Sequence, residues 1–237
     1  MGVQLESLEL RPEGGELRIS TDRLIRAQTT ISTIPSAALV GALQAPTEVR
    51  DAVDRLAFRG AVLVYLTVPR TQYSPVDAHY FPESSTIVSR LSEPKNYRTS
   101  VGDPPQHTVL CAEIPATVGD AVWLTDDDEL VSRVSRELVE QGLPAPMHTS
   151  GHVERRTHVY PIYHRGFEHS QRLVESYLDS QPNLAVLGRQ ALFAHDNTHH
   201  ALLMGKGAAE ALDTDGHLNR ERWMLMRRSF EDHVVED

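Results

Sequence analysis

The densest group of polar side chains in the sequence follows a short apolar run near the C-terminus. It consists of His195, Asp196, Asn197, Thr198, His199 and His200. A helix rich in small residues is predicted to begin within this group, and a helix N-terminus presents unbonded N–H groups and the positive end of the helix dipole. Arg189 lies upstream and adds a permanent positive charge. The pattern therefore predicts a site for a phosphate or for the edge of an anionic ring.

Two other interpretations of these residues stay open. In the first, Asn197 or Thr198 only caps the helix, and the histidines face solvent. In the second, His195 and His199 bind a metal ion because they are four residues apart, although the start of this stretch is predicted to be a loop. The sequence has one cysteine, Cys111, so a zinc site would need almost all of its ligands from other residue types. We therefore predict no metal site.

The common sequence motifs of cofactor and catalytic sites do not occur in the chain. It contains no GxGxxG, no GxxxxGK[ST], no HExxH and no GxSxG. Dinucleotide binding by this chain alone is therefore unsupported.

The composition limits the classes of function. The 237 residues include 33 acidic and 23 basic side chains, and the formal net charge of -10 disfavours a nucleic acid or an anionic membrane as the main partner. A single cysteine excludes an intramolecular disulfide and fits a reducing compartment. The N-terminal residues do not resemble a signal peptide, and no apolar run approaches the roughly 18 residues of a membrane span. We expect a cytoplasmic protein that acts on small molecules.

The elements that must position the polar residues are those of an α+β fold. Strands are predicted at Val3–Leu10, Glu16–Ile19, Gln28–Ile34, Ala61–Val68, His79–Phe81, Thr86–Leu91, Thr108–Ile114, His152–Tyr163 and Asn183–Leu187. Helices are predicted at Pro35–Val40, 46–57, Leu130–Leu138, Phe167–Leu178, Thr198–Leu212 and Arg220–Phe230. The run Thr125–Asp128 has the spacing of a capping box, and Gly142 is expected to end the helix that follows it.

The segment around the polar group also carries a family resemblance. Residues 188–212, GRQALFAHDNTHHALLMGKGAAEAL, resemble the C-terminal FAD-contacting segment of the flavin-dependent amine oxidase superfamily. The similarity is greatest to protoporphyrinogen-oxidase-like proteins and eukaryotic-type UDP-galactopyranose mutases, whose pattern is close to G-R-x-G-L-F-x-Y-x-N-x-D-H. Residues 31–35 (ISTIP), 80–82 (YFP), 89–90 (SR) and 160–163 (YPIY) are similar to other segments of these families, in the same order. The resemblance covers residues 15–212.

The resemblance implies an FAD cofactor and a role for each matching residue. Gly188 and Arg189 would contact the diphosphate and ribityl region of FAD. The helix start, with Asn197, Thr198, His199 and His200, would face the pyrimidine edge of the isoalloxazine. A positive dipole there stabilises the negative charge of the reduced flavin.

The chain departs from the family pattern at three positions. Ala191, His195 and His199 stand where the pattern has glycine, tyrosine and aspartate. The flavin environment or the substrate pocket is therefore expected to differ from that of the family.

The family architecture also assigns the segments of the chain. It makes residues 1–45 outer strands of the FAD-binding domain, 46–165 the substrate-binding domain, 166–215 the return segment of the FAD-binding domain and 216–237 a helical tail. In the family, the glycine-rich βαβ unit that binds the ADP part of FAD comes before these segments. We therefore expect a mixed or antiparallel substrate-domain sheet joined to the C-terminal part of a Rossmann-like FAD-binding domain whose N-terminal part is missing. A partner chain that carries this part, or self-association through the apolar surface left exposed, is expected.

Several aromatic and basic residues are further candidates. Tyr160, Tyr163 and His195 are candidates for the substrate pocket, but Tyr160 and Tyr163 are three residues apart and face opposite sides of a regular strand unless Pro161 distorts it. The alternative is that both tyrosines are core or edge aromatics. The remaining candidates are His158 and His164 for proton transfer, and Arg155 and Arg156 for an anionic substrate, each with surface exposure as its alternative.

Three functions are compatible with the sequence. The first is an FAD-dependent oxidoreductase of the amine oxidase or protoporphyrinogen oxidase type, in an incomplete or split form, in which FAD accepts a hydride from a C–N or C–C bond. Its catalytic residues are not identified. The second is a mutase-like reaction on a nucleotide sugar with reduced flavin. The third is a non-catalytic binding or scaffolding module.

Overall fold

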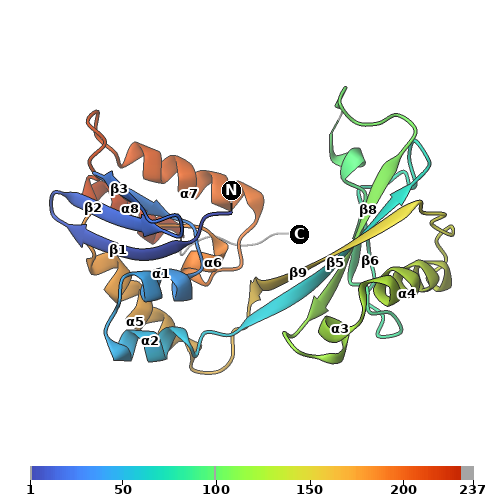
Figure 1. Cartoon of the computed structure of the whole chain (residues 1–237), viewed down its shortest axis with the longest axis horizontal. Helices are drawn as coiled ribbons and strands as arrows, with labels where there is room; N and C mark the ends of the chain where they lie inside the picture. Colours follow the sequence, from blue (N-terminus) through green and yellow to red (C-terminus); the bar gives the residue numbers. More distant parts are fainter. Residues whose placement is uncertain (1, 99, 231–237) are drawn as a thin grey trace. The chain divides into compact units, whose positions relative to one another are not determined.

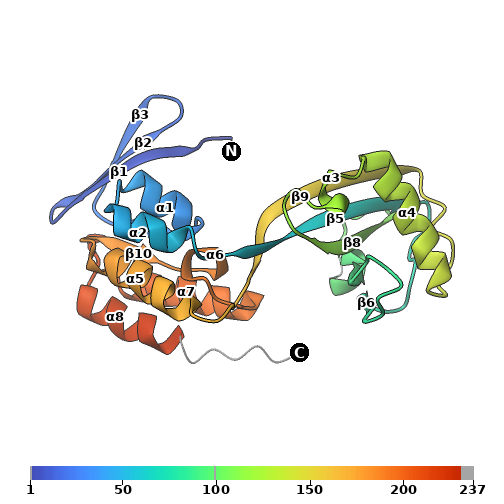
Figure 2. The same ribbon diagram turned by 90° about the horizontal axis from the view of Figure 1, so that it is seen from below.

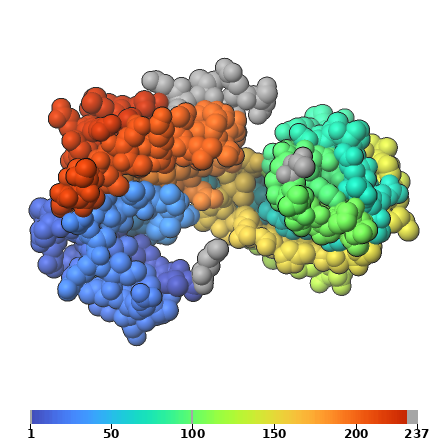
Figure 3. Space-filling view, turned by 90° about the horizontal axis from the view of Figure 1, so that it is seen from above, coloured from blue at the N-terminus to red at the C-terminus, as the bar shows by residue number. Residues whose placement is uncertain are grey.

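The chain folds into two compact units of mixed α/β structure. The computed structural model describes residues 2–98 and 100–230 (Figure 1). Unit 1 contains the residues up to Ala57 and those from Tyr160 onward, and unit 2 contains Phe58–Val159. Figure 3 shows the N-terminal segment in blue and the C-terminal segment in orange and red within unit 1. Unit 1 is therefore assembled from two parts of the chain that are far apart in sequence.

Unit 1 begins with an antiparallel sheet of three strands. These are β1 (Leu5–Arg11), β2 (Gly14–Ile19) and β3 (Arg23–Ala27), in that order across the sheet. The strands predicted at Val3–Leu10 and Glu16–Ile19 are confirmed, and they pair as an antiparallel hairpin. Its turn needs Gly14, whose φ is +145° and whose position leaves no room for a side chain, since an added Cβ would lie 2.6 Å from the carbonyl oxygen of Ala27. Sequence analysis missed β3 because four of its five residues are exposed, so no apolar alternation marks it.

A second sheet of unit 1 is a pair of short parallel strands. They are β4 (Thr30–Ser32) and β10 (Leu184–Val186). The Thr30 N–H donates to the carbonyl oxygen of Asn183 (2.8 Å), and the Leu187 N–H donates to that of Ser32 (3.0 Å). All three residues of β10 are buried. This pairing joins the two distant parts of the chain.

Six helices within the described residues pack around these sheets. They are α1 (Ser36–Ala42), α2 (Thr47–Val53), α5 (Phe167–Ser180), α6 (Arg189–Leu192), α7 (Thr198–Glu210) and α8 (Arg220–Ser229). Helix α8 packs on α7 and buries Trp223. The guanidinium of Arg227 in α8 is buried and pairs with the carboxylate of Glu175 in α5, with an N–O distance of 2.8 Å. The predicted helices between Pro35 and Phe230 in this unit are confirmed within a few residues.

Unit 2 is built on a sheet of five strands. Its order is β6 (Ala78–Tyr80), β7 (Arg90–Ser92), β8 (Thr108–Ala116), β5 (Phe58–Val68) and β9 (Ser150–Pro161), and the last two residues of β9 belong to unit 1. The 3-10 helix η1 (Pro94–Tyr97) and the helices α3 (Ala121–Leu124) and α4 (Asp127–Glu140) complete the unit. The apolar side chains of β5 at Val62, Val64 and Leu66 are fully buried in one core with Leu130 and Val134 of α4. Figure 2 shows α4 beside the strands of this sheet.

The opposite face of this sheet carries polar and aromatic side chains. In the register of the strands, Tyr80, Arg90, Glu113 and Leu63 stand next to one another across four strands. The carboxylate of Glu113 is buried and lies 2.5 Å from the guanidinium of Arg90. This alternation between an apolar and a polar face is typical of an antiparallel sheet packed on one side.

Two expectations for unit 2 were wrong in detail. The strand expected at Thr86–Leu91 begins only at Arg90, because the Ile87 N–H and the Thr86 hydroxyl both donate to the Glu137 carboxylate of α4 (2.8 Å each). These groups are therefore not used in a strand ladder. The N-cap of α4 is Asp126, which accepts from the Asp128 N–H (2.9 Å), and not Thr125, which ends the short helix α3.

A buried carboxylate links η1 to the rest of unit 2. Glu93 is 2% exposed, and its carboxylate accepts hydrogen bonds from four donors. They are the backbone N–H groups of Tyr73 (2.9 Å) and Ser74 (2.9 Å), the Asn96 amide (3.2 Å) and the Thr108 hydroxyl (2.7 Å). One side chain thus connects the loop after β5, η1 and β8.

We predict that Glu93→Gln destabilises unit 2 by about 2–3 kcal/mol, because the amide nitrogen cannot accept a hydrogen bond and leaves buried donors without a partner. The chain has two tryptophans, Trp123 in unit 2 and Trp223 in unit 1. Urea unfolding followed by Trp123 fluorescence in a Trp223→Phe background measures unit 2. Glu83→Gln, at an exposed position, is the control and should change the stability by less than about 0.5 kcal/mol. Equal effects of the two substitutions would contradict this role of Glu93.

Candidate functional site

The candidate site lies in unit 1, where the parallel strands β4 and β10 end. The chain leaves β10 through Leu187 and Gly188, forms α6, passes through residues 193–197 and enters α7. In open sheets of parallel strands, ligands bind outside the carboxyl ends of the strands. The residues predicted from the polar group at 195–200 are therefore placed where a ligand is expected.

Gly188 has a conformation that other residues avoid. Its φ is +93° and its ψ is 155°, in a region that is populated almost only by glycine. A Cβ at this position would find no atom closer than 4.0 Å, the nearest being the Cβ of Thr33. The glycine is therefore required by the backbone angle and not by crowding, since the space where a Cβ would lie is open.

The start of α7 contains a capping box. Asn197 is the N-cap, and its side chain accepts from the N–H of His200. In return, the Asn197 N–H donates to Nδ1 of His200 (3.1 Å). The His200 ring is buried, and Nδ1 carries no proton when it accepts this bond, so the Asp196 carboxylate at 3.5 Å from Nδ1 does not form an ion pair with it.

The capping box leaves two N–H groups of the first turn for other partners. Within the described residues, no hydrogen bond is formed by the N–H of Thr198 or His199. The capping interpretation and the anion-site interpretation are therefore compatible. Asn197 and His200 satisfy each other, while Thr198 and His199 present their N–H groups at the positive end of a helix of 13 residues.

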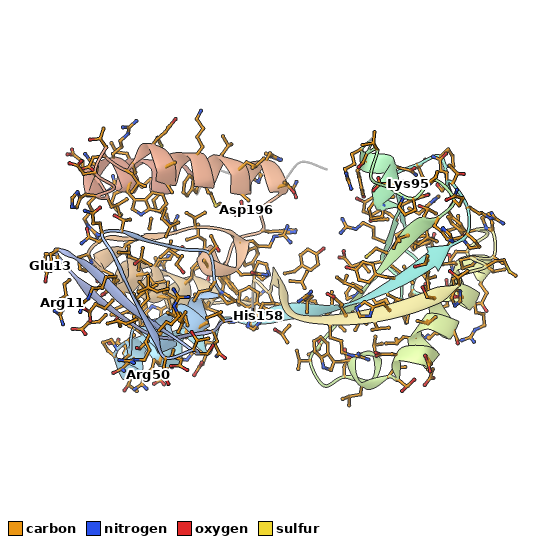
Figure 4. The ribbon with its side chains drawn as sticks, turned by 45° about the horizontal axis from the view of Figure 1, so that its top comes forward. Arg11, Glu13, Arg50, Lys95, His158 and Asp196 are labelled. Carbon is orange, nitrogen blue, oxygen red and sulfur yellow. The ribbon has the colours of Figure 1, made fainter. Side chains whose placement is uncertain are left out.

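Arg189 fixes the loop that leads into α7. Its Nε donates to the carbonyl oxygen of Asp196 (3.0 Å), and one of its terminal nitrogens donates to the same oxygen. Its guanidinium also lies over the ring of Tyr160, 5.2 Å from the ring centroid. Figure 4 shows Asp196 at the start of α7. The positive charge of Arg189 is thus held beside the loop.

Both candidate tyrosines reach this loop. The ring of Tyr160 meets that of His195 edge-on, with centroids 5.6 Å apart. The Tyr163 hydroxyl donates to the carbonyl oxygen of Phe193 (3.3 Å), and its ring stacks on Phe167 at 4.8 Å. Strand β9 ends at Pro161, so the opposite-face rule for residues three apart does not apply here. Burial raises the pKa of Tyr163, so its hydroxyl stays protonated and can donate.

The remaining histidines of the group lie at the surface. The side chains of His195 and His199 are exposed, and the ring of His199 is 3.9 Å from that of His200. Within the described residues, no three His, Cys, Asp or Glu side chains are gathered in a way that could hold a metal ion.

Sequence reasoning missed two buried hydroxyls near the site. Ser32 at the end of β4 and Ser36 at the start of α1 are 6% and 2% exposed, and their hydroxyls have no hydrogen-bond partner in the part of the chain that the structure describes. A buried hydroxyl without a partner is unfavourable. The signal for them was the occurrence of serine in an otherwise apolar segment, IST followed by IPS.

The candidate arginines of β9 are bound by protein groups. The guanidinium of Arg155 donates to the carbonyl oxygens of Trp123 (2.8 Å) and Thr125 (2.6 Å) and to the Asp127 carboxylate (2.7 Å). It therefore ties β9 to the end of α3 and the start of α4. Arg156 pairs with Glu154.

The candidate proton carriers and the cysteine also have structural partners. Nδ1 of His158 lies 2.7 Å from the hydroxyl of Thr157, and its ring packs on Phe58. Burial raises the pKa of the Cys111 thiol in β8, so the thiol is protonated at neutral pH.

The chain belongs to the family of flavin containing amine oxidoreductases, whose family model matches residues 1–212. No curated protein matches the sequence.

Solved structures of this superfamily share the fold. Reduced UDP-galactopyranose mutase matches with a TM-score of 0.65 and 15% identity, over 96% of this chain and 45% of the mutase. A putative protoporphyrinogen oxidase from Exiguobacterium sp. 255-15 matches with a TM-score of 0.58 and 15% identity, over 97% and 46%. Putrescine oxidase bound to putrescine matches with a TM-score of 0.58 and 11% identity, over 96% and 47%. The chain thus spans about half the length of the structures that it matches.

The mixed α/β architecture of the two units is that of FAD-dependent oxidoreductases, and the family implies a flavin cofactor. Within the described residues, no helix is both long and apolar enough to cross a membrane.

We predict that Gly188→Ala lowers the stability of unit 1 by about 1–3 kcal/mol, because alanine is strained at this backbone angle. Gly205→Ala is the matched substitution: Gly205 lies within α7 with no atom near its missing Cβ, so alanine there should stabilise the unit by about 0.5–1 kcal/mol. The stability of unit 1 in both variants is measured by urea unfolding, followed by Trp223 fluorescence in a Trp123→Phe background. The same sign for the two variants would contradict this account of Gly188.

We predict a pH-dependent contribution of His164 to the stability of unit 1. Its ring nitrogens lie 3.1 Å from the carbonyl oxygen of Arg55 and 3.2 Å from that of Arg165, and these bonds, with a smaller effect of Glu168, raise its pKa. The protonated ring can donate to both carbonyls. The contribution of His164 to the stability of unit 1 is therefore complete at pH values below its ordinary pKa of about 6.5. This contribution is lost as the pH rises through the higher pKa of the folded state.

An NMR titration of the His164 ring protons measures this pKa in the folded and urea-unfolded chain. His164→Gln should remove this part of the pH dependence, and His169→Gln, at an exposed position of α5, should not. A folded pKa at or below the unfolded one would contradict the role.

Proposed function

We propose that this chain forms the substrate-binding part and the flavin-facing segment of an FAD-dependent oxidoreductase. The observation that carries the proposal is the path of the chain at the carboxyl end of β10: Gly188 follows the strand with a backbone angle that only glycine readily adopts, and α6 and a short loop held by Arg189 lead to the first turn of α7. The N–H groups of Thr198 and His199 in that turn fit a polar ligand that accepts hydrogen bonds. The family membership makes FAD the ligand that fits.

The residues of unit 1 have separate roles in this proposal. Gly188 allows the backbone to approach the ribityl and diphosphate region, and Arg189 places a permanent positive charge beside it. Thr198 and His199 offer their N–H groups to the pyrimidine edge of the isoalloxazine, while Asn197 and His200 hold the turn in place. The helix dipole would favour negative charge on that edge.

We assign substrate binding to the central segment of the chain, residues 46–165, with Tyr160, Tyr163 and His195 as pocket residues. Bound flavin would supply the acceptor for a hydride from a substrate C–H bond, so that the adjoining C–N or C–C single bond becomes a double bond as the neighbouring atom loses a proton. The aromatic rings of these residues would exclude water and orient an organic substrate. Tyr163, whose hydroxyl donates to the carbonyl oxygen of Phe193, would act through its ring.

A mutase-like reaction on a nucleotide sugar is the second candidate. It needs arginines that can reach a diphosphate. Arg155 and Arg156 are held by protein carboxylates and carbonyls, and Arg90 pairs with Glu113. These pairs favour the oxidoreductase over the mutase.

The remainder of a flavin site would be supplied by polypeptide outside the described residues. In β10, the N–H and C=O groups of Ala185 face β4. Because these groups alternate along a strand, those of Leu184 and Val186 face the opposite edge. No further strand pairs with that edge in the described part of the chain. We propose that a parallel strand of a glycine-rich βαβ unit pairs there, either in the same polypeptide or in a partner chain. Without it, this edge and the apolar surface around it would favour self-association.

Visible spectroscopy of the purified chain tests the proposal. We expect a colourless protein with weak affinity for added FAD, since the chain has no GxGxxG segment. Addition of a polypeptide that carries the βαβ unit should give a stable complex with the absorption bands of bound flavin. Asn197→Ala should weaken flavin binding in this complex, whereas Lys206→Ala, at an exposed position of the same helix, should not.

The outcomes separate the three functions. Tightly bound FAD in the chain alone would contradict the need for a second part. A complex that forms without flavin would identify a scaffold. Flavin that supports turnover only after reduction, with a nucleotide sugar as substrate, would identify the mutase.

A further inference from the structure

A pocket of about 470 Å³ lies within unit 2, at the end of the sheet where β5 ends and β8 begins. Thr67 of β5 and Val109 of β8 line it from the sheet, and η1 and the loop after it line it with Lys95, Arg98, Pro104 and His107. Figure 4 shows Lys95 in this region of unit 2. The volume is that of a site for a small organic molecule.

Lys95 holds the loop and keeps a donor for a ligand. The residue is half-buried, and its ammonium group donates to the carbonyl oxygens of Pro104 (2.8 Å) and His107 (3.0 Å) in two exposed hydrogen bonds. An ammonium group has three N–H donors, so one remains. Within the described residues, no carboxylate lies at ion-pair distance from Lys95.

The charges around the pocket leave one positive charge without a counterion. Arg98 pairs with Asp103 at 3.3 Å, so these two charges cancel. The carboxylate of Glu93 keeps its charge, but it is buried behind Thr108, does not line the pocket and has its oxygens bound by four neutral donors. The charged residues that line the pocket, Lys95, Arg98 and Asp103, sum to one positive charge, which is complementary to a single negative charge on a ligand.

The rest of the pocket is largely apolar. Val109 is 39% exposed although it lies in a strand, and the rings of Pro94 and Pro104 are exposed beside it. Contact with these groups favours a ligand with a hydrocarbon or aromatic body. A doubly charged, fully polar anion such as phosphate would leave these surfaces unused.

We propose that this pocket binds a small monocarboxylate with an apolar body, whose carboxylate accepts a hydrogen bond from the Lys95 ammonium. The site lies entirely in unit 2 and needs no flavin, so it goes beyond the proposed function and can be tested independently of it.

Three ligands with the same ring and different head groups test the proposal on the whole chain. Benzoate, benzyl alcohol and benzylamine are titrated into the ¹⁵N-labelled protein, and the amide signals of residues around Lys95, His107 and Val109 are followed. Benzoate should bind at these residues, and benzylamine should bind at least about tenfold more weakly, because one charge-assisted hydrogen bond contributes about a factor of ten or more. Inorganic phosphate is titrated as a fourth probe.

Substitutions locate the charge that is responsible. Lys95→Gln should weaken benzoate binding about tenfold, Lys95→Arg should keep it within a few-fold, and Lys206→Gln, at an exposed position of unit 1, should leave it unchanged. Equal binding of benzylamine and benzoate by the native protein would overturn the proposal, as would signal changes confined to other residues. Tighter binding of phosphate than of benzoate would contradict the proposed preference for a ligand with an apolar body. An unchanged affinity of Lys95→Gln for benzoate would show that Lys95 does not bind the carboxylate.

Discussion

The parallel pairing of β4 with β10 is the interaction on which unit 1 depends. The two strands are three residues long each and are separated by about 150 residues of chain, including all of unit 2. Such a pairing has a high entropic cost, because a long loop must close before its few hydrogen bonds form. The cost is offset by burial: all of β10 is covered, and Leu178 of α5 and Met204 of α7 are in the same core. Since both strands end at the same edge, the pairing also creates the candidate site.

Elements with strong local patterns could be predicted from the sequence, and elements defined by distant partners could not. Helix α4 has Leu130, Val134 and Leu138 on one side, and all three are buried as predicted. Strand β3 has no buried face, so its backbone bonds to β2 alone define it. The segment before β7 has the sequence pattern of a strand. Its Thr86 hydroxyl and Ile87 N–H donate instead to the Glu137 carboxylate of α4. A contact with a residue so far along the chain cannot be predicted from the local sequence.

The candidate site shows the same division. The polar group at 195–200 and the helix after it are visible as a pattern, because capping residues and small residues have local preferences. The contacts of Arg189 with Asp196 and Tyr160 depend on the path of the chain between β9 and α7, which no spacing rule describes. The buried hydroxyls of Ser32 and Ser36 are informative only once their burial is known.

Several carboxylates and guanidinium groups inside the two units are bound by protein groups, and this sets them aside as ligand sites. Glu93, Glu137, Arg155 and Arg227 each hold elements of the fold together. A charge that is already bound in this way is a poor ligand, because a substrate would have to displace its partners. Two kinds of donor are available to a ligand: the N–H groups of Thr198 and His199 in the first turn of α7, which make no hydrogen bond within the described residues, and the ammonium of Lys95, which keeps one N–H. The first are uncharged donors at a helix end and suit a delocalised ring edge, whereas the second is a localised charge and suits a carboxylate, so the two units present different recognition chemistry.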